Sequence, residues 1–233
     1  MLLVLWDLDH TLLEVRNVSR EAYAVGFERV TGVRLTRLAP MAGRTDRAII
    51  AETFHLHALE PSEEMVDRVG TAVGEEYAAR SAQVPGNGRV LPGALEALRE
   101  LGRLADVHQS VLTGNMRPIA LVKLSSLGLA DRLDLASGAF GMDHAERWRL
   151  VSMAARRAEA ALGLADLAIA PEDTVLIGDT PLDVAAAAAA GARAIAVATG
   201  ASSAADLRAA GAATVFEDLT DTARLVRAVR GSA

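Results

Sequence analysis

Met1-Leu-Leu-Val-Leu-Trp-Asp-Leu-Asp-His-Thr-Leu-Leu13 carries the strongest pattern in the sequence, an apolar run followed by two acids. Leu2 to Trp6 is a short continuous apolar run, which is typical of a strand buried on both faces of a parallel sheet, although periodicity alone also fits a buried helical segment. Asp7 and Asp9 follow at once. Active sites of open parallel sheets lie at the carboxyl ends of the strands, and two acids so close repel each other unless a proton or cation lies between them. The stretch therefore indicates a metal site with a carboxylate free to act as nucleophile; two solvated loop acids are the alternative.

The composition limits the kind of protein that this chain can be. Its 233 residues are 51% hydrophobic, enough for one large domain or for a core with a smaller appendage. A net charge of −6 argues against a nucleic-acid partner. Because there is no cysteine, a disulfide framework, a thiolate nucleophile and a zinc–thiolate site are excluded. Lys123 is the single lysine against 23 arginines, which indicates a compositional bias of the source.

No targeting or membrane segment is expected. The first apolar run lacks a basic leader and is interrupted by Asp7, so it does not read as a signal peptide. The longest apolar-rich stretch, Leu182 to Ala201, is mostly alanine and contains Asp183 and Arg193, which makes it too weakly apolar to span a bilayer. We expect a cytoplasmic protein that binds neither nucleic acid nor membrane.

A second strand-plus-acid signature lies far along the chain, at Pro171-Glu-Asp-Thr-Val-Leu-Ile-Gly-Asp-Thr-Pro-Leu-Asp183. Thr174 to Ile177 predicts a strand, and Asp179 and Asp183 follow it. Thr180-Pro181 fits the N-cap and the first position of a helix. Two acids stabilised by the positive end of a helix dipole would explain this motif by itself. They would not explain why the same signature occurs at both ends of the chain.

The Asp-x-Asp-x-Thr pattern that begins at Asp7 resembles the first motif of the haloacid dehalogenase-like hydrolase superfamily, most closely its phosphoglycolate phosphatase-like phosphatases. The Gly-Asp-x-x-x-Asp pattern at Asp179 and Asp183 resembles the fourth motif of that family. The resemblance implies that Asp7 attacks phosphorus and becomes an aspartyl-phosphate, while Asp9 is the general acid and base. It also implies a Mg²⁺ ion held by Asp7, Asp9 (through its backbone carbonyl) and Asp179, with Asp183 in a supporting role.

A strand is also expected over Val107 to Leu112, ending at Thr113-Gly114-Asn115. This resembles the family's second motif, in which Thr113 would donate a hydrogen bond to a phosphoryl oxygen. Gly114 and Asn115 could offer backbone N–H groups at the start of the next helix, where the dipole favours an anion. Ordinary helix capping by Thr113 or Asn115 is the alternative.

The third motif is altered. The family places a lysine there to hold the negative charges of the nucleophile and the phosphate together, but the matching segment, His144 to Val151, contains none. Arg147 is the best substitute, with Arg149 as its neighbour, because arginine carries a fixed positive charge and binds phosphate in a bidentate manner. Lys123 is a further possibility, although its place in the middle of a helix predicts a solvated surface charge.

Between Val15 and Val84 the chain shows no strand-like run, and helices are predicted over 19–30, with Ser19 as N-cap, from Asp46 to about His57, and from Pro61 to about Ala82. In the family, such a block is a cap that closes over the active site and selects the substrate. Gly43-Arg44-Thr45-Asp46 resembles a cap segment that points toward the site, which would make Arg44 a substrate contact; an ordinary helix N-terminus is the alternative.

The remaining pattern completes the predicted architecture. Five further elements are expected: a helix over 91–102, strands over 133–140, 193–198 and 214–216, and a terminal helix from about Thr220. We predict an α/β fold with a doubly wound, mostly parallel sheet. The core would comprise residues 1–15 and 86–233, and the helical cap residues 16–85.

The implied function is Mg²⁺-dependent hydrolysis of a small phosphomonoester. A sugar-phosphate mutase of the same fold stays open, as does a 2-haloacid dehalogenase, although Asp9 and the second acidic motif argue against the latter. A non-enzymatic, phosphate-accepting regulatory domain is the alternative outside the enzymes. Phosphoglycolate is a guess from family frequency, and the oligomeric state is not predicted.

Overall fold

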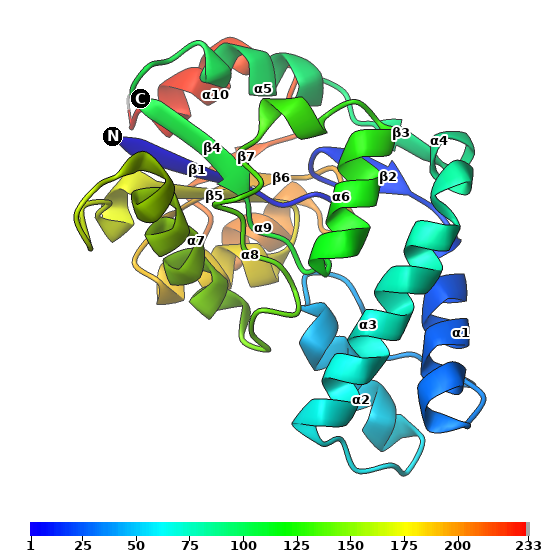
Figure 1. Cartoon of the computed structure of the whole chain (residues 1–233). Helices are drawn as coiled ribbons and strands as arrows, with labels where there is room; N and C mark the ends of the chain where they lie inside the picture. The colour runs from blue at the N-terminus through cyan, green and yellow to red at the C-terminus, as the bar shows by residue number, and fades with distance from the viewer. Residues whose placement is uncertain (232–233) are drawn as a thin grey trace.

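The computed structural model describes residues 1–231 and shows a layered α/β body beside a smaller helical lobe (Figure 1). Five parallel strands form one sheet in the order β4-β1-β5-β6-β7, and two short antiparallel strands form a second. The strands are β1 (Leu2–Trp6), β2 (Leu13–Val15), β3 (Gly88–Val90), β4 (Val107–Val111), β5 (Thr174–Gly178), β6 (Arg193–Val197) and β7 (Thr214–Phe216). The predicted α/β fold class is confirmed.

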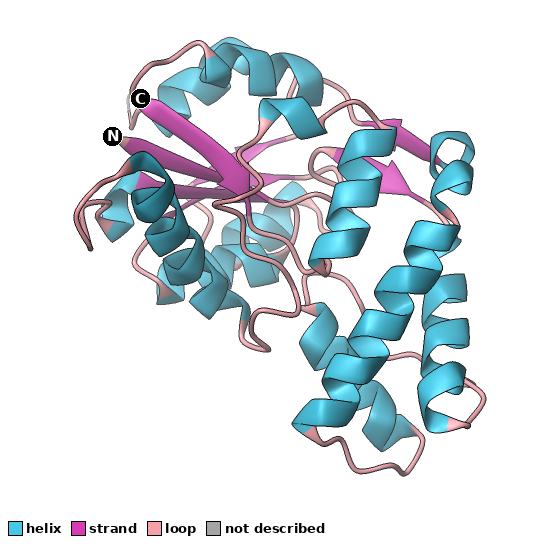
Figure 2. Cartoon of the chain, viewed as in Figure 1, coloured by secondary structure: helices cyan, strands magenta, loops and turns pink. Residues whose placement is uncertain are grey.

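Helices cover both faces of the five-stranded sheet (Figures 1 and 2). In chain order the α-helices are α1 (Val18–Thr31), α2 (Asp46–Leu56), α3 (Glu63–Ala79), α4 (Val84–Asn87), α5 (Ala94–Gly102), α6 (Arg117–Ser126), α7 (Arg147–Leu162), α8 (Pro181–Ala189), α9 (Ala204–Ala209) and α10 (Thr222–Val229). The core residues of α5, α6 and α10 share one hydrophobic cluster, and those of α7 and α8 share another. The sheet is therefore doubly wound.

Strand β1 shows why its whole sequence is apolar. Successive side chains of a strand point to opposite faces, so Val4 and Trp6 join the cluster under α5 and α10, whereas Leu3 and Leu5 join the one under α7 and α8. All four side chains are fully buried. Because β1 lies between β4 and β5, both of its edges are also paired. A central strand of this kind fixes the position of the residues that follow it.

The helical lobe consists of α1, α2 and α3, which pack around their own hydrophobic cluster. Gly26 of α1 lies so close to α3 that a Cβ atom there would fall 2.7 Å from the backbone nitrogen of Val73, so a glycine is needed for this contact. The chain leaves the sheet through β2 and returns through β3, and these two strands pair with each other. Two side chains from the start of α6, Met116 and Ile119, complete the cluster of the lobe. The division into a core of 1–15 and 86–233 with a cap of 16–85 stays a proposal, and the separate cluster is its physical basis.

Two details of the predicted elements are wrong. Residues 133–140 do not form a strand and make only a single bridge, between Ala139 and Leu112. The carboxylate of Asp134 accepts hydrogen bonds from the backbone N–H of Ala136 and from the hydroxyl of Ser137, which closes a turn within the segment. Helix α1 begins at Val18 rather than after Ser19, and helix α9 was not predicted.

None of the helices within residues 1–231 is both long enough and apolar enough to cross a membrane.

Candidate active site

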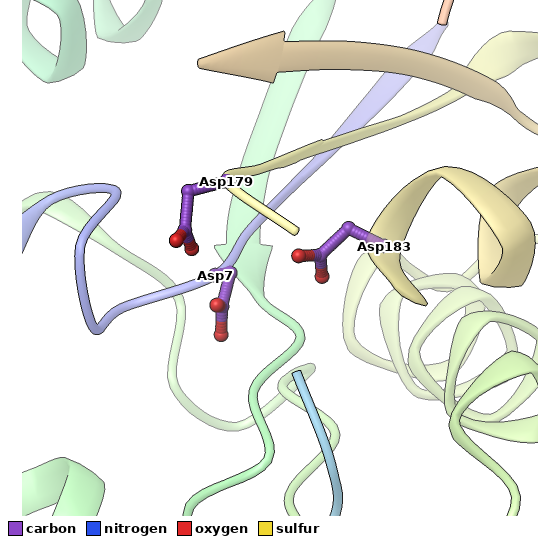
Figure 3. Close-up of side chains that lie close together, drawn as sticks. All are labelled: Asp7, Asp179 and Asp183. Atoms are coloured by element: carbon purple, nitrogen blue, oxygen red, sulfur yellow. The ribbon is translucent and has the colours of Figure 1, made fainter. Parts of the chain in front are cut away.

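The two strand-plus-acid signatures meet at the carboxyl edge of the sheet. Trp6 at the end of β1 pairs with Ile177 near the end of β5, and the backbone N–H of Asp7 donates to the carbonyl of Ile177 over 2.9 Å. The carboxylates of Asp7, Asp179 and Asp183 converge there, with one oxygen of each lying within 4.8 Å of the others (Figure 3). All three side chains are buried. Adjacent parallel strands therefore bring together residues that are about 170 positions apart in the sequence.

Burial and the repulsion between neighbouring carboxylates raise pKa values in this cluster. Burial raises the pKa of Asp7 to about 6, with Arg147 opposing and the neighbouring acids adding to the shift. Burial and the charges of Asp7 and Asp183 raise the pKa of Asp179 to about 8. The only hydrogen bond to the carboxylate of Asp179 from another side chain of residues 1–231 comes from the Thr11 hydroxyl, at 3.4 Å. A buried set of hard oxygen donors with too little positive charge nearby fits a divalent cation such as Mg²⁺.

Asp183 is more fully occupied than the other two acids. One of its oxygens accepts from the Arg147 guanidinium at 2.6 Å. The other accepts from both the backbone N–H and the hydroxyl of Thr180. The Thr180 hydroxyl oxygen in turn accepts from the backbone N–H of Asp183, which completes a capping box at the start of α8. The predicted N-cap at Thr180 and Pro181 in the first turn are confirmed. Asp183 therefore holds Arg147 and the helix start, which leaves Asp7 and Asp179 as the freer oxygen donors.

The carboxylate of Asp9 does not join the acidic cluster. Both of its oxygens accept from the ammonium of Lys123, at 2.8 and 2.6 Å, and one also accepts from the Asn115 amide at 2.8 Å. Burial disfavours the ionised form, but the charge and hydrogen bonds of Lys123, with the bond from Asn115, lower the pKa of Asp9 below its ordinary value. The prediction that Asp9 helps to hold the metal thus has no support from its side chain, because the ammonium occupies both oxygens; its backbone carbonyl is the group that the prediction named.

The expectation that Lys123 is a solvated surface charge is wrong. The residue is only 2% exposed, because α6 turns this position inward toward the loop after β1. Besides Asp9, its ammonium donates to the Asn115 side-chain oxygen at 2.8 Å and lies 6.0 Å from the centre of the Tyr77 ring in α3. A carboxylate, an amide oxygen and the face of an aromatic ring thus accommodate one buried cation.

Arg147 lies where the altered third motif predicted a cation. Its guanidinium is 3.1 Å from Asp7 and 2.6 Å from Asp183, and the side chain is buried. The Nε–H of Arg147 is buried without a hydrogen-bond partner in the described part of the chain. An unpaired buried donor is costly, so this position is suited to an incoming anion. Arg149 is exposed and pairs with Glu146, which removes it from the site.

The Thr113-Gly114-Asn115 turn follows β4, the strand on the other side of β1. The Thr113 hydroxyl oxygen accepts from the backbone N–H of Asn115 at 3.2 Å and from its side chain at 2.9 Å, which leaves the hydroxyl proton available to an anion. A Cβ atom on Gly114 would lie 2.0 Å from the carbonyl oxygen of Arg44, so only glycine allows the backbone of Arg44 to approach this turn. Asn115 mainly holds Asp9 and Lys123 in place.

The start of α2 joins the helical lobe to this turn. Thr45 is the N-cap and accepts from the backbone N–H of Ala48, so the ordinary helix N-terminus that the sequence allowed is present. The carboxylate of Asp46 accepts from the Tyr23 hydroxyl at 2.5 Å and from the backbone N–H of Met116 at 2.6 Å. Its backbone N–H donates to the carbonyl of Gly114 at 2.8 Å. Asp46 therefore fastens both α1 and α2 to the core beside the Thr113-Gly114-Asn115 turn.

These groups surround one cavity of about 330 Å³. That volume is at the small end of ligand pockets. Arg44 lines the cavity, but its guanidinium pairs with Glu52 at 2.6 Å, so its predicted role as a substrate contact stays a prediction. The predicted site residues that line the cavity are Asp7, Asp9, Arg44, Thr113, Gly114, Asn115, Arg147 and Asp179.

Sequence reasoning missed Asp46, Tyr23 and the place of Lys123. Asp46 looked like an ordinary first-turn acid, and nothing in the sequence pairs it with Tyr23. Lys123 did carry a signal, since it is the single lysine in a chain that uses arginine at 23 other basic positions. A compact ammonium can contact both oxygens of one carboxylate in this enclosed position. A planar guanidinium is larger and has a different shape, so the two cations are not interchangeable here.

Residues 4–188 match the family model of haloacid dehalogenase-like hydrolases. No curated protein gives a significant match.

Several solved structures share the fold. A hydrolase from Pseudomonas syringae superposes with a TM-score of 0.66 at 19% identity and covers 100% of both chains. A predicted phosphoglycolate phosphatase from Haemophilus somnus gives 0.65 at 16%, covering 96% of this chain and 97% of its own. CbbY from Rhodobacter sphaeroides, solved with phosphate, gives 0.68 at 20%, covering 95% and 96%. Because the family model spans most of its length, the chain belongs to the haloacid dehalogenase-like hydrolase family.

Proposed function

We propose that this hydrolase is a Mg²⁺-dependent phosphatase that cleaves a small phosphomonoester through an aspartyl-phosphate on Asp7. One observation carries the proposal. Asp7 directly follows the buried central strand β1, and its carboxylate lies beside that of Asp179. Arg147, a buried arginine whose Nε–H has no partner in the described chain, lies next to Asp7. A nucleophile, a cation site and an anion donor thus share one edge of the sheet.

The chemistry of the first step follows from these neighbours. A carboxylate oxygen of Asp7 attacks phosphorus, and the bond from phosphorus to the alcohol oxygen breaks. Arg147 and the Thr113 hydroxyl donate to the phosphoryl oxygens and offset their charge. Bound Mg²⁺, held by Asp7 and Asp179 with the Asp9 carbonyl, would supply further positive charge at the transferring group. The departing alkoxide takes its proton from Asp9.

Asp9 then serves as the base for the second step. Water attacks the phosphorus of the aspartyl-phosphate and gives its proton to the Asp9 carboxylate, which frees Asp7 and inorganic phosphate. Lys123 and Asn115 fix the Asp9 carboxylate in one orientation between the steps. The charge of Lys123 and the hydrogen bonds from both residues favour the ionised form of Asp9, which suits its role as a base. The dianionic phosphate of an arriving substrate is a like charge that raises the pKa of Asp9 and so promotes the acid role.

Two neighbours in the structure comparison carry the name β-phosphoglucomutase, so a sugar-phosphate mutase stays an alternative within the same chemistry. A mutase returns the phosphoryl group from Asp7 to a sugar rather than to water. The two activities differ in their product, because only the phosphatase releases inorganic phosphate in step with substrate loss.

The test is a Mg²⁺-dependent screen over small phosphorylated metabolites, with release of inorganic phosphate as the readout and Asp7→Asn assayed in parallel. We expect the wild-type protein to hydrolyse a subset of the compounds, and we expect Asp7→Asn to stay folded and lose turnover. Equal rates in the two proteins would remove Asp7 as the nucleophile. A stable aspartyl-phosphate without turnover would favour a regulatory domain instead.

A further inference from the structure

The charged side chains that line the cavity can be sorted by the partners they already have. Arg147 is paired with Asp7 and Asp183, and Lys123 is paired with Asp9. Arg44 turns its guanidinium to Glu52. Of the arginine and lysine side chains around the cavity, three are therefore neutralised by carboxylates of the protein.

Arg20 is the exception. It lies in the first turn of α1, on the cap side of the cavity that it lines. No carboxylate of residues 1–231 lies within ion-pair distance of its guanidinium, and none of the hydrogen bonds in that part of the chain involves its side chain. Its neighbours along the chain differ, because Arg16 pairs with Glu14 and Glu21 pairs with Arg80. Arg20 thus carries a positive charge at the cavity that the protein itself does not offset.

The wall next to Arg20 is also polar. Asn17 and Ser19 line the cavity from the same segment. The Asn17 side chain makes no capping hydrogen bond to α1, although the residue stands at the N-cap position. An amide group and a guanidinium from one short segment can bind the oxygens of a carboxylate or a phosphate together.

We propose that Arg20, assisted by Asn17, holds a second anionic group of the substrate. The inference rests on the proposed phosphatase function and narrows it. The phosphoryl group would lie against Asp7, Arg147 and Thr113, at the carboxyl edge of the sheet. The rest of the substrate would extend toward α1 and end in a carboxylate or a second phosphate. A cavity of about 330 Å³ limits the carbon chain between them to a few atoms.

The experiment compares phosphomonoesters that differ only in the charge of the remainder. Ethyl phosphate has a neutral remainder, phosphoglycolate ends in a carboxylate, and 1,3-propanediol bisphosphate ends in a second phosphate. Each is assayed with Mg²⁺ on wild type, Arg20→Gln and Arg34→Gln. Arg34 is the matched control, because it is an exposed arginine of the same lobe that has no ion-pair partner in the described chain and does not line the cavity.

We expect wild type to prefer at least one of the two anionic compounds over ethyl phosphate. The compound that it prefers shows whether the second anionic group is a carboxylate or a phosphate. Arg20→Gln should lower kcat/KM on the preferred compound by about fivefold or more, mainly through KM, and leave ethyl phosphate within about twofold. High salt should shrink the difference, because screening weakens an interaction at an exposed guanidinium. Arg34→Gln should change neither substrate.

Two results would overturn the inference. One is an equal loss on charged and neutral substrates in Arg20→Gln, and the other is a wild-type enzyme that shows no preference for a charged remainder. Binding to Asp7→Asn, measured by calorimetry with and without Arg20→Gln, separates this inference from the phosphatase proposal. If no compound is hydrolysed, the phosphatase proposal fails, and the calorimetric comparison of phosphoglycolate with ethyl phosphate still decides whether Arg20 binds the second anion.

Discussion

Asp7 and Asp9 lie two residues apart, yet their carboxylates have opposite electrostatic surroundings. Asp7 faces two other buried acids, and burial raises its pKa to about 6. Asp9 faces an ammonium and an amide, and the pKa of Asp9 is lowered although burial opposes this. The difference comes from two helices distant in sequence, because α7 supplies Arg147 to the first carboxylate and α6 supplies Lys123 to the second.

This contrast indicates that the site uses two cations for separate tasks. Arg147 bridges Asp7 and Asp183 and keeps an Nε–H for a ligand. Lys123 is enclosed by Asp9, Asn115 and the ring of Tyr77. We infer that Arg147 serves the phosphoryl group and that Lys123 positions the acid–base carboxylate.

Asp9→Asn should separate the roles of the two acids most strongly. The amide keeps the size of the side chain but cannot transfer the proton, so kcat on an alkyl phosphate should fall by about 10²–10⁴-fold. With p-nitrophenyl phosphate, the rate at which the aspartyl-phosphate forms should fall much less, because this leaving group needs no proton. Rapid-quench kinetics on both substrates provide the measurement. Equal losses of that step on the two substrates would show that Asp9 does not protonate the leaving group.

Arg147→Ala should weaken phosphate handling more than Lys123→Ala. Removing the guanidinium takes away donors to the phosphate, so KM should rise by at least about tenfold. Loss of Lys123 should act mainly on kcat, with KM close to that of wild type. Steady-state kinetics measure both, and Arg147→Lys, which retains a charge, should fall between wild type and Arg147→Ala. The reverse order of the two alanine variants would assign phosphate binding to Lys123.

Both substitutions should also destabilise the fold, because each leaves a buried carboxylate without its cation. Removing one partner of a buried pair typically costs about 3–5 kcal/mol. Arg149→Ala is the matched control, since its ion pair with Glu146 is exposed and is expected to contribute less than about 1 kcal/mol. Urea unfolding followed by circular dichroism compares the three variants. A neutral result for Arg147→Ala would contradict its burial between the acids.

The raised pKa values of the buried acids predict how the stability of the metal-free protein depends on pH. The raised pKa values of Asp179, about 8, and of Asp7 and Asp46, about 6, exceed the value of about 3.9 for an unfolded aspartate. The folded state therefore binds more protons than the unfolded state between about pH 4 and pH 8, so the free energy of unfolding falls as pH rises through that window. We expect a loss of at least about 1 kcal/mol, roughly 2–4 °C in Tm.

The measurement is thermal unfolding in chelator at pH 5 and pH 8, repeated with Mg²⁺. Because Mg²⁺ competes with protons for the carboxylates, it should raise Tm more at pH 8 than at pH 5. Asp179→Asn should reduce both the pH dependence and the response to Mg²⁺. An increase in the Tm of the metal-free protein between pH 5 and pH 8 would contradict the description of the cluster.

Tyr23→Phe should lower the free energy of unfolding by less than the loss of either buried cation. It removes the hydroxyl that donates to Asp46 in the contact between α1 and the start of α2, and a lost buried hydrogen bond typically costs about 1–3 kcal/mol when its partner stays unsatisfied. Thermal unfolding of this variant and of Asp46→Asn tests the contact. Unchanged stability in both would show that Asp46 does not fasten the lobe.

The sequence indicated the parts of the molecule that depend on local pattern. The apolar run of β1 and the acids after it, like Thr180 and Pro181 at the start of α8, are readable because strand burial and helix capping involve neighbouring residues. Arg147 was found through its position in a motif. The inward turn of Lys123 was not, because it depends on the rotation of α6 and on the loop that carries Asp9, more than a hundred residues earlier.

The strand predicted over 133–140 was also wrong because of a contact between distant residues. Its apolar residues, such as Leu133 and Phe140, do enter the core, as a strand's would. The carboxylate of Asp134 instead closes a turn and binds His108 of β4 at 3.0 Å, an interaction that no local pattern shows.

In the proposed mechanism Asp7, rather than Asp9, forms the covalent bond to phosphorus. The most direct measurement is rapid acid quench of wild type and Asp9→Asn during turnover of p-nitrophenyl phosphate with Mg²⁺, followed by peptide mass spectrometry. We predict one added phosphoryl group on Asp7 in both proteins, with a larger steady-state fraction in Asp9→Asn because the base for hydrolysis is missing. Phosphate on any other residue, or turnover without a covalent intermediate in either protein, would contradict the account.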